Sequence, residues 1–326
     1  MILVTGGTGF LGSHLLLHLV KNKISPVATY RTKNKINFVR IFFYENDLNG
    51  EILFEKIKWR KCDITNYSDV EKSIKGITKI FHCAGLISFL KEDFDDLINV
   101  NKLGTQNLVN LSILKKIEKF IFISSISTLD NNQNNNEINE DSNWDTENKH
   151  SPYSFSKFNA ELEIWRAMEE GLPSIIVNPG VIIGSGITPN PSNYIKKFTK
   201  NKLVFYPSGN ISFVHINDVV SCIFKLMNSK ILNQRFILVS NNWPYKKLFR
   251  SILKKSNKKQ FMIKADKKIL YTFNFFGYLL SKFFFKKRIF NSELIKSVCN
   301  LSVINGNRIK SFISFNYKET NDINYF

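Results

Sequence analysis

The sequence predicts an α/β protein: a doubly wound parallel sheet followed by a smaller C-terminal lobe. Three observations support this fold class. Short apolar runs of strand length alternate with segments of helical periodicity. Glycines cluster directly after the first of these runs, and beyond Gly180 the regular alternation stops. With 326 residues, 43% of them hydrophobic, the chain is long enough to bury a large core.

The predicted elements follow one another in a regular order. Strands are expected at residues 1–5, 26–30, 57–62, 79–83, 119–124 and 174–178. Helices are expected at residues 10–22, 34–44, 94–115 and 153–170. Because helices join consecutive strands, the sheet should be parallel and covered on both faces. The asparagine-rich residues 130–149 interrupt this order and are predicted to form a surface loop.

The net charge of +19 comes from 46 Lys and Arg against 27 Asp and Glu. The lysines are spread along the chain and form no basic arm, so we attribute the charge to composition and expect no nucleic-acid partner. The apolar residues 269–288 are too interrupted to cross a membrane and are predicted to form a buried helix. Contact of this segment with a membrane surface is the less favoured alternative.

Cysteine and histidine spacing argues against metal sites. The four cysteines lie far apart with no CxxC pair, which predicts a reducing compartment, the cytoplasm, and no disulfide or zinc site. His14 and His18 have a spacing that suits a metal, but no third ligand is evident, so no metal is predicted. His215 is expected to be a structural or helix-start residue and not a base.

The glycine cluster TGGTGFLG predicts a dinucleotide site. Gly6, Gly9 and Gly12 follow a strand and open a helix. The first permits a tight turn, the second lets a pyrophosphate approach the backbone, and the third lets the helix pack closely on the sheet. Phe10 and Leu11 begin the helix whose amide groups would face the phosphates.

The end of the second strand predicts which dinucleotide is bound. An acidic residue there would accept from the ribose hydroxyls of NAD, but ATYRTKNK supplies Arg31 and Lys33 instead. Cations suit a 2′-phosphate, so NADP(H) is favoured and NAD(H) is the alternative. After the third strand, Asp63 and Ile64 are placed beside the adenine, whose amino group would donate to Asp63.

A tyrosine and a lysine form the candidate catalytic pair. Tyr153 and Lys157 are four residues apart, on one face of a helix. The ammonium group is expected to lower the tyrosine pKa from its usual value near 10, so that the pair can exchange a proton. Serines of FISSIST would face the ligand crevice at the end of the fifth strand, with Ser125 as the candidate and Ser124 as its rival.

Together these motifs resemble the extended short-chain dehydrogenase/reductases, over nearly the whole chain. The matching segments are TGGTGFLG, HCAG, VNKLGTQNLV, FISS, YSFSK, VNPGVIIG and FVHINDVV. Within that family, SPYSFSKFNAELEIWR and NGNRIKSFISFNYKE are most similar to the dihydroflavonol-4-reductase and 3β-hydroxysteroid-dehydrogenase-like branch. That branch reduces ketones or oxidises secondary alcohols with NAD(P).

The resemblance implies a role for each matched residue. Tyr153 would be the general acid/base, Lys157 would bind the nicotinamide ribose, and Ser125 would hold the substrate oxygen. The remaining matched residues that would line the cofactor are Ala84, Gly85, Asn101 and Pro179. The asparagine-rich insert separates Ser125 from Tyr153 more widely than is usual in the family, which bears on substrate selection more than on chemistry.

The preferred function is hydride transfer between NADP(H) and an apolar ketone or secondary alcohol. The alternatives are a nucleotide-sugar epimerase or dehydratase, and a non-catalytic NADP-binding sensor or scaffold. Residues 1–179, rejoined by about 212–242, would form a Rossmann-type NAD(P)-binding domain, and the remainder of 180–326 the substrate-binding lobe. Aromatic residues at 273–285 would suit an apolar substrate, and a homodimer is an open alternative to a monomer.

Overall fold

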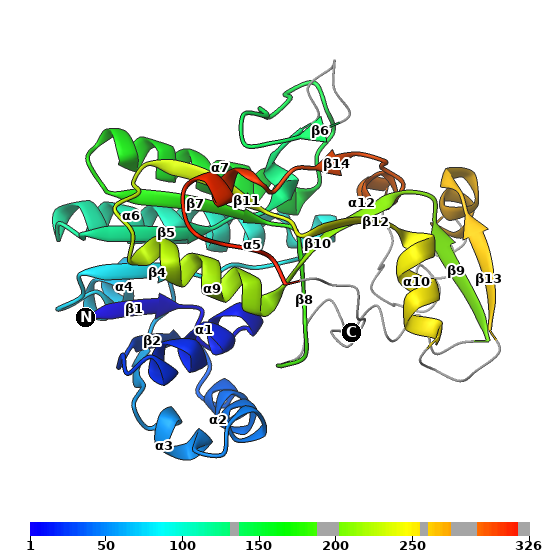
Figure 1. The fold of residues 1–326 in the computed structure, drawn as a ribbon. Helices are drawn as coiled ribbons and strands as arrows, with labels where there is room; N and C mark the ends of the chain where they lie inside the picture. Colours follow the sequence, from blue (N-terminus) through cyan, green and yellow to red (C-terminus); the bar gives the residue numbers. More distant parts are fainter. Residues whose placement is uncertain (131–136, 188–201, 255–259, 275–291, 319–326) are drawn as a thin grey trace.

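A computed structural model shows a seven-stranded parallel sheet at the centre of the molecule (Figure 1). It describes residues 1–130, 137–187, 202–254, 260–274 and 292–318. The strand order is β11-β7-β5-β4-β1-β2-β3. The strands are β1 (Ile2–Thr5), β2 (Val27–Tyr30), β3 (Lys58–Lys61), β4 (Lys79–His82), β5 (Lys119–Ile123), β7 (Ser174–Pro179) and β11 (Gln234–Leu238). The predicted doubly wound α/β fold is confirmed.

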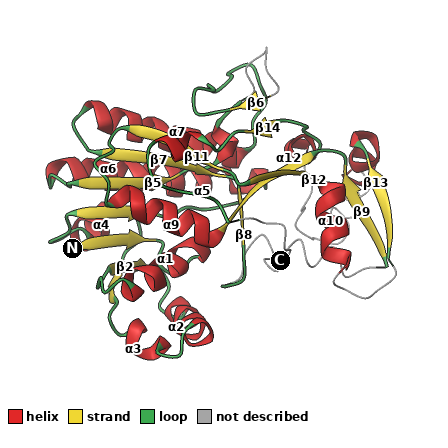
Figure 2. Cartoon of the chain, in the orientation of Figure 1, coloured by secondary structure: helices red, strands yellow, loops and turns green. Residues whose placement is uncertain are grey.

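Helices cover both faces of this sheet (Figure 2). One face packs on α1 (Phe10–Lys21) and α9 (Ile216–Met227). The other packs on α4 (Tyr67–Ser73), α6 (Gly104–Leu114) and α7 (Pro152–Glu169). The two-sided burial explains the almost continuous apolar sequence of the central strands, such as KFIFI in β5. Two further helices, α2 (Lys35–Asn46) and α3 (Gly50–Phe54), follow β2.

The strand order reverses at β1. From β1 the chain proceeds outward to β2 and β3, and then returns to place β4 on the opposite side of β1. In open parallel sheets, a crevice forms at such a reversal, beyond the carboxyl ends of the strands. The glycine loop and the serines of FISSIST both lie at this edge, because each directly follows the carboxyl end of a strand.

Most predicted elements match, but the helix predicted at 94–115 does not continue unbroken. The structure has α5 (Phe94–Leu97), then a π-helical turn at Ile98–Leu103, and then α6. A π-turn widens a single turn of a helix, and hydrophobic periodicity, which is read over several turns, could not show a change this local. Asn101 lies in this turn and is buried.

The insert predicted as a surface loop contains a short strand. β6 (Glu137–Ile138) pairs in parallel with β14 (Val303–Ile304), which lies near the end of the chain. Ile138 is buried in a small cluster with Ile237 and Ile304. The sequence around Ile138 is polar and shows no strand pattern. The pairing partner lies more than a hundred residues away, so no local pattern could indicate it. Residues 131–136 of the insert lie outside the described residues.

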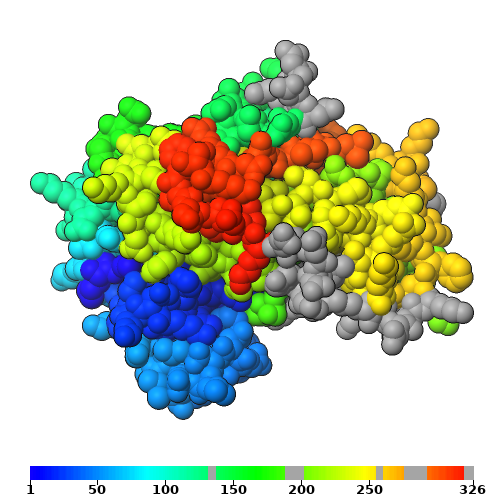
Figure 3. Space-filling view, viewed as in Figure 1, coloured from blue at the N-terminus to red at the C-terminus, as the bar shows by residue number. Residues whose placement is uncertain are grey.

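Beyond Gly180 the chain builds smaller sheets and returns once to the large one. The elements are β8 (Val181–Ile183), β9 (Leu203–Pro207), β10 (Asn210–His215), β12 (Asn241–Pro244), α10 (Tyr245–Lys254), β13 (Phe261–Ala265), α12 (Ser292–Val298) and a 3₁₀ turn at Arg308–Ser311. Strands β12, β10 and β8 form one sheet, and β9 pairs with β13. The last described residues, in red, lie over the yellow-green segment that includes α9 (Figure 3).

The predicted buried helix at 269–288 is described only as far as residue 274. Residues 269–274 are helical, but only Leu270 is buried there, while Ile269, Tyr271 and Phe273 are 37%, 36% and 51% exposed. The prediction of a buried helix is therefore wrong for this part. The rest of the segment, with most of the aromatic cluster at 273–285, lies outside the described residues. None of the helices in the described residues is long and apolar enough to cross a membrane.

Candidate active site

The glycine loop packs so tightly that side chains would not fit. Gly6 has a φ of +66°, and a Cβ added to it would lie 2.8 Å from the Cα of Ala84. The amide of Gly9 donates to the carbonyl oxygen of Gly6 at 2.9 Å, which closes the turn. A Cβ on Gly12 would collide with the same carbonyl oxygen. The loop between β1 and α1 therefore sits directly against the HCAG segment that follows β4.

The N-terminus of α1 is suited to an anion. Gly9 is its N-cap residue, and within the described residues no side chain caps this helix and no acid lies in its first turn. The first amides of a helix carry partial positive charge and need acceptors, which a phosphate supplies. Phe10 and Leu11 stand at this start, as predicted. A dinucleotide pyrophosphate fits this cradle.

A series of buried hydrogen bonds centred on His82 supports the glycine loop. His82 Nδ1 lies 2.7 Å from Thr5 Oγ1, and His82 Nε2 lies 2.9 Å from Thr105 Oγ1. Thr105 donates to the carbonyl of Asn101, and Thr5 accepts from the amide of Ala84. These bonds leave the imidazole neutral, with its proton on Nε2. Burial lowers the pKa of His82 to about 3, which agrees with a neutral ring.

Asn101 fastens the loop after β4 to the helix that carries the catalytic pair. Its Oδ1 accepts from the Leu86 amide at 2.7 Å, and its Nδ2 donates to the Leu86 carbonyl at 3.0 Å and to Ser156 Oγ at 2.9 Å. A Cβ added to Gly85 would come 3.2 Å from Asn101 Oδ1. Asn101 therefore holds Gly85 close to α7.

Ser125, Tyr153 and Lys157 converge at the carboxyl end of β5. The side chains of Ser125 and Tyr153 lie near each other, and the Ser125 hydroxyl favours the ionised form of the tyrosine. Lys157 donates from Nζ to the Ile123 carbonyl at 2.7 Å, and its ammonium lies 4.2 Å from the centre of the Phe122 ring. Ser151 caps α7 by accepting from the Ser154 amide, so the helix begins just before the tyrosine. A carbonyl oxygen placed beside Ser125 and Tyr153 would meet two hydroxyl donors.

The pKa of the tyrosine differs from the prediction. Burial raises the pKa of Tyr153 to about 12, and the nearby Ser125 hydroxyl opposes this only in part. Burial also lowers the pKa of Lys157 to about 8. The spacing placed the lysine correctly on the helix face, but its ammonium is engaged by the Ile123 carbonyl and the Phe122 ring. Desolvation of the phenolate therefore decides the pKa of Tyr153.

The two candidate serines have different surroundings. Ser124 donates to the buried carboxylate of Glu161. The Ser125 hydroxyl lies near that of Tyr153, and its Oγ accepts from the Ser127 amide at 3.2 Å. Of these two serines, Ser125 is the one whose hydroxyl lies near the tyrosine, while the Ser124 hydroxyl is engaged by Glu161. Glu161 did not enter the sequence prediction, although it continues the helical spacing of Tyr153 and Lys157.

The predicted adenine and ribose contacts lie at the neighbouring strand ends. Arg31 is exposed directly after β2. Asp63 accepts at Oδ1 from the amide and hydroxyl of Thr65, at 3.0 and 2.8 Å, so one oxygen is held within its own turn. Ile64 is buried against the position of Gly104, and Pro179 ends β7. The structure thus places these residues around one edge of the sheet.

The histidines outside this edge have structural partners. His14 bonds to the Ser185 carbonyl at 3.0 Å, and His18 packs on Phe224. The His215 side chain accepts from the Asn217 amide and caps α9, which confirms its predicted place at a helix start. In the described ranges, no group of three His, Cys, Asp or Glu side chains could hold a metal ion.

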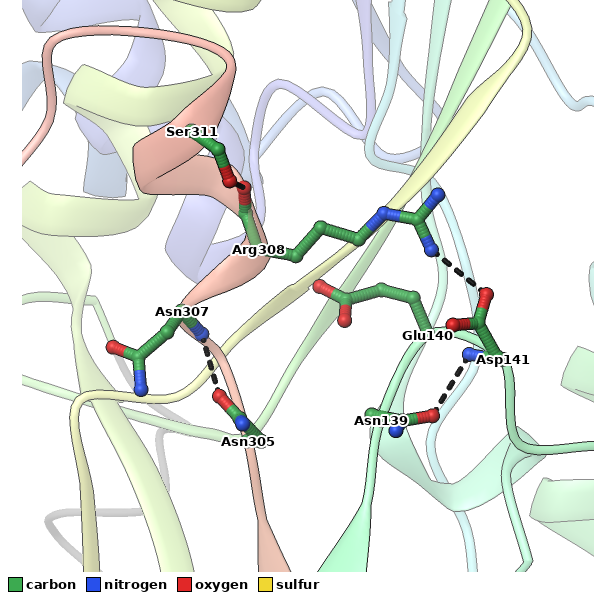
Figure 4. Close-up of a pocket in the computed structure, with 7 residues that line it drawn as sticks. All are labelled: Asn139, Glu140, Asp141, Asn305, Asn307, Arg308 and Ser311. Atoms are coloured by element: carbon green, nitrogen blue, oxygen red, sulfur yellow. Dashed lines mark hydrogen bonds and ion pairs between the residues drawn. The ribbon is translucent and has the colours of Figure 1, made fainter.

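A separate surface pocket lies between the insert and the end of the chain (Figure 4). Its lining residues are Asn139, Glu140, Asp141, Asn305, Asn307, Arg308 and Ser311. Arg308 pairs with Asp141 at 2.9 Å, and the Glu140 carboxylate accepts from the Ile237 amide at 3.0 Å. These contacts hold the insert to the rest of the fold, so we interpret the pocket as a structural junction.

Fold and site together define a dinucleotide-binding protein of the Rossmann class. The family model for the NAD dependent epimerase/dehydratase family matches residues 2–237. The chain belongs to this family, as the resemblance predicted.

Relatives with different activities share this family. The chain is 26% identical to tetraketide alpha-pyrone reductase 2 of Arabidopsis thaliana, over 73% of this chain and 77% of the relative. It is 28% identical to UDP-glucose 4-epimerase of Vibrio cholerae, over 73% and 70%. A relative from Synechocystis sp. is matched over only 60% of its own length. The crystal structure of gox2253 superposes with a TM-score of 0.79 at 22% identity, covering 97% of this chain and 93% of that one, which supports the fold.

Proposed function

We propose that the protein is an oxidoreductase that transfers hydride between NADP(H) and a ketone or secondary alcohol. The convergence of Ser125, Tyr153 and Lys157 at the carboxyl end of β5, the edge of the sheet that also holds the glycine loop, is the observation that carries this proposal. The bound nicotinamide would supply the hydride. The residues of the chain have to bind the substrate oxygen and supply the proton.

Tyr153 is the proton donor in the direction of reduction. Its raised pKa keeps the phenol protonated at neutral pH, so the hydroxyl can donate to an oxygen that gains negative charge. Ser125 holds that oxygen. Lys157, which is 4% exposed, donates to the Ile123 carbonyl at the strand end, where it would contact the nicotinamide ribose of a bound cofactor. A charged Lys157 would then stabilise the phenolate that remains after proton transfer.

The cofactor is proposed to be NADP(H). The exposed guanidinium of Arg31, directly after β2, is free of an acidic neighbour in sequence and suits a 2′-phosphate. The substrate is proposed to be apolar, because the described residues near the tyrosine include Phe89, whose ring centre lies 6.0 Å from that of Tyr153. Phe89 and Ile87 are 38% and 69% exposed.

A nucleotide-sugar epimerase is the second candidate, because UDP-glucose 4-epimerase of Vibrio cholerae is among the relatives. Both reactions use the same hydride chemistry but differ in their net product. The reductase consumes NADPH, whereas an epimerase returns the hydride to the sugar. A sensor would bind NADPH without either reaction.

These three functions can be separated with the purified wild-type protein. NADPH absorbance is followed with a panel of aryl and alkyl ketones, and UDP-glucose isomerisation is measured in parallel. Loss of NADPH matched by alcohol formation supports the reductase. Isomerisation of UDP-glucose without net NADPH loss supports the epimerase instead, and NADPH binding with no turnover of any compound supports the sensor.

A further inference from the structure

Glu161 is a fully buried carboxylate on α7, one helical turn beyond Lys157 and two turns beyond Tyr153. Its Oε1 accepts from the Ser124 hydroxyl, and also from Thr128 Oγ1 at 2.7 Å and Asn178 Nδ2 at 2.6 Å. Its Oε2 pairs with the Arg235 guanidinium at 2.8 Å. One side chain therefore joins α7 to β7, to β11 and to the segment that follows β5.

These bonds surround Ser125 without involving its hydroxyl. Ser124 precedes it in the chain, and Asn178 Nδ2 also donates to the Ser125 carbonyl at 3.0 Å. Because Glu161 and Tyr153 share one rigid helix, the carboxylate sets the distance between that helix and the backbone of Ser125. A shift of either element would separate the two hydroxyls that the proposed chemistry requires.

Glu161 also supplies negative charge near Lys157. The titratable groups that interact with that ammonium are Glu161 on its own helix and His82 and Cys83 at the end of β4, and Tyr153 lies one helical turn away. His82 is neutral, burial raises the pKa of the Cys83 thiol to about 12, and the phenol of Tyr153 is protonated. Among these described groups, the Glu161 carboxylate is the anion, and it raises the pKa of Lys157 against the effect of burial.

The buried ion pair between Glu161 and Arg235 is expected to add little net stability to the fold. Desolvation of both charges commonly cancels their attraction, and well-packed apolar residues can give equal or greater stability. Arg235 is 15% exposed at its side chain and stacks on Trp165 of α7, with its guanidinium carbon 5.1 Å from the ring centre. An apolar pair could occupy this space, but it would leave Lys157 without an anion.

We propose that Glu161 is a positioning residue of the active site. It holds the helix of Tyr153 and Lys157 against the backbone of Ser125, and it keeps the Lys157 ammonium charged. This inference rests on the proposed oxidoreductase function. It separates into a geometric part and an electrostatic part, and two substitutions at the same residue distinguish them.

The experiment measures NADPH affinity and kcat/KM with a ketone substrate, from pH 6 to 10, in the wild type and three variants. Glu161→Gln keeps the shape but removes the charge, so the alkaline decline in kcat/KM and NADPH affinity should move to lower pH by roughly one pH unit. Glu161→Asp keeps the charge but shortens the side chain, so kcat should fall about tenfold or more with the alkaline decline unmoved. Glu163→Gln removes a carboxylate from the same helix that pairs with Arg166. It should match the wild type.

The outcomes are distinguishable from failure of the proposed function. A wild type that neither binds NADPH nor reduces ketones overturns the proposed function and this inference with it. An active wild type whose profile is unchanged in Glu161→Gln overturns the electrostatic part. Normal kcat in Glu161→Asp overturns the geometric part. If Glu161→Gln does not fold, Arg235→Lys provides the second test: it should lower kcat without moving the alkaline decline, and unchanged kcat contradicts the proposal.

Discussion

Two similar lysine ammonium groups lie at opposite ends of β5, in different surroundings. Lys119 lies at the amino end of the strand, and the ammonium of Lys157 lies at the carboxyl end. Each residue is 4% exposed, and each ammonium donates to a backbone carbonyl, Ser229 at 2.6 Å and Ile123 at 2.7 Å. Burial lowers the pKa of both to about 8. By these criteria the two lysines are nearly equivalent.

Lys119 and Lys157 differ in the groups that surround them. Lys79 adds a like charge near Lys119. Lys157 lies one turn from Tyr153, whose hydroxyl lies near that of Ser125, and the glycine loop lies at the same edge of the sheet. A perturbed lysine therefore does not by itself indicate a site. The carboxyl edge of a parallel sheet does so, because there the loops bring hydroxyls, amides and a cation together.

The sharpest test of this comparison replaces each lysine with methionine. Lys157→Met should reduce single-turnover hydride transfer at least about a hundredfold and should weaken NADPH binding, because the ammonium serves both steps. Lys119→Met should leave both unchanged, since its partner is a surface turn after α9. The measurements are NADPH fluorescence titration and stopped-flow absorbance.

Circular dichroism on both lysine variants provides the control for folding. Equal losses of hydride transfer in Lys157→Met and Lys119→Met would show that the effect is one of stability, and the distinction between the two ends of β5 would be lost.

The next largest effect concerns His82, whose buried hydrogen bonds to Thr5 and Thr105 support the glycine loop at the carboxyl edge of the sheet. Its folded pKa of about 3 lies below the usual value of 6.5, so the unfolded chain takes up the proton first as the pH falls. The free energy of unfolding should therefore fall between pH 7 and pH 5, with about 2 kcal/mol of the loss due to His82. His14 and His215, whose pKa values burial also lowers, add to the total loss.

Urea denaturation at pH 7 and pH 5 checks this share. His82→Gln should be less stable at pH 7, but its loss between the two pH values should be about 2 kcal/mol smaller than in the wild type. An identical loss in both proteins would mean that His82 is not held neutral by the fold.

The smallest predicted change concerns the adenosine end of the cofactor, where the 2′-phosphate of NADP(H) would lie. The wild type should bind NADPH more tightly than NADH, by about tenfold, because a charge-assisted bond from Arg31 to the 2′-phosphate is expected. Arg31→Asp should reverse the order. Lys35→Asp, a charge reversal at an exposed position in the first turn of α2, is the matched control. Equal affinities for both cofactors in the wild type would contradict this assignment.

Sequence reasoning succeeded where the pattern is local. Six of the seven strands of the large sheet, all but β11, match the prediction within a residue or two, because buried strands read as short apolar runs bounded by turns. The residues placed at the carboxyl edge do lie there, since that edge follows from strand order. The roles assigned to Ser125, Tyr153 and Lys157 remain predictions.

The failures involve contacts that are distant in sequence. The β6–β14 pairing joins segments that no local pattern connects. The tyrosine pKa depends on desolvation by the surrounding fold, which the spacing of Tyr153 and Lys157 does not show. Glu161 has two partners that lie far from it in the sequence: Asn178 on β7 and Arg235 on β11. Such partners become visible only when the sheet is assembled.

The central claim is that Tyr153 gives the proton during hydride transfer. Tyr153→Phe keeps the ring and removes the hydroxyl, and Tyr317→Phe, which loses a hydroxyl bonded to the Gly306 carbonyl at 2.7 Å, is the control. The most direct measurement is single-turnover oxidation of bound NADPH by an excess of ketone. We predict that Tyr153→Phe binds NADPH normally but transfers hydride about 10² to 10⁴ times more slowly, whereas Tyr317→Phe matches the wild type. Hydride transfer by Tyr153→Phe at the wild-type rate would contradict the account.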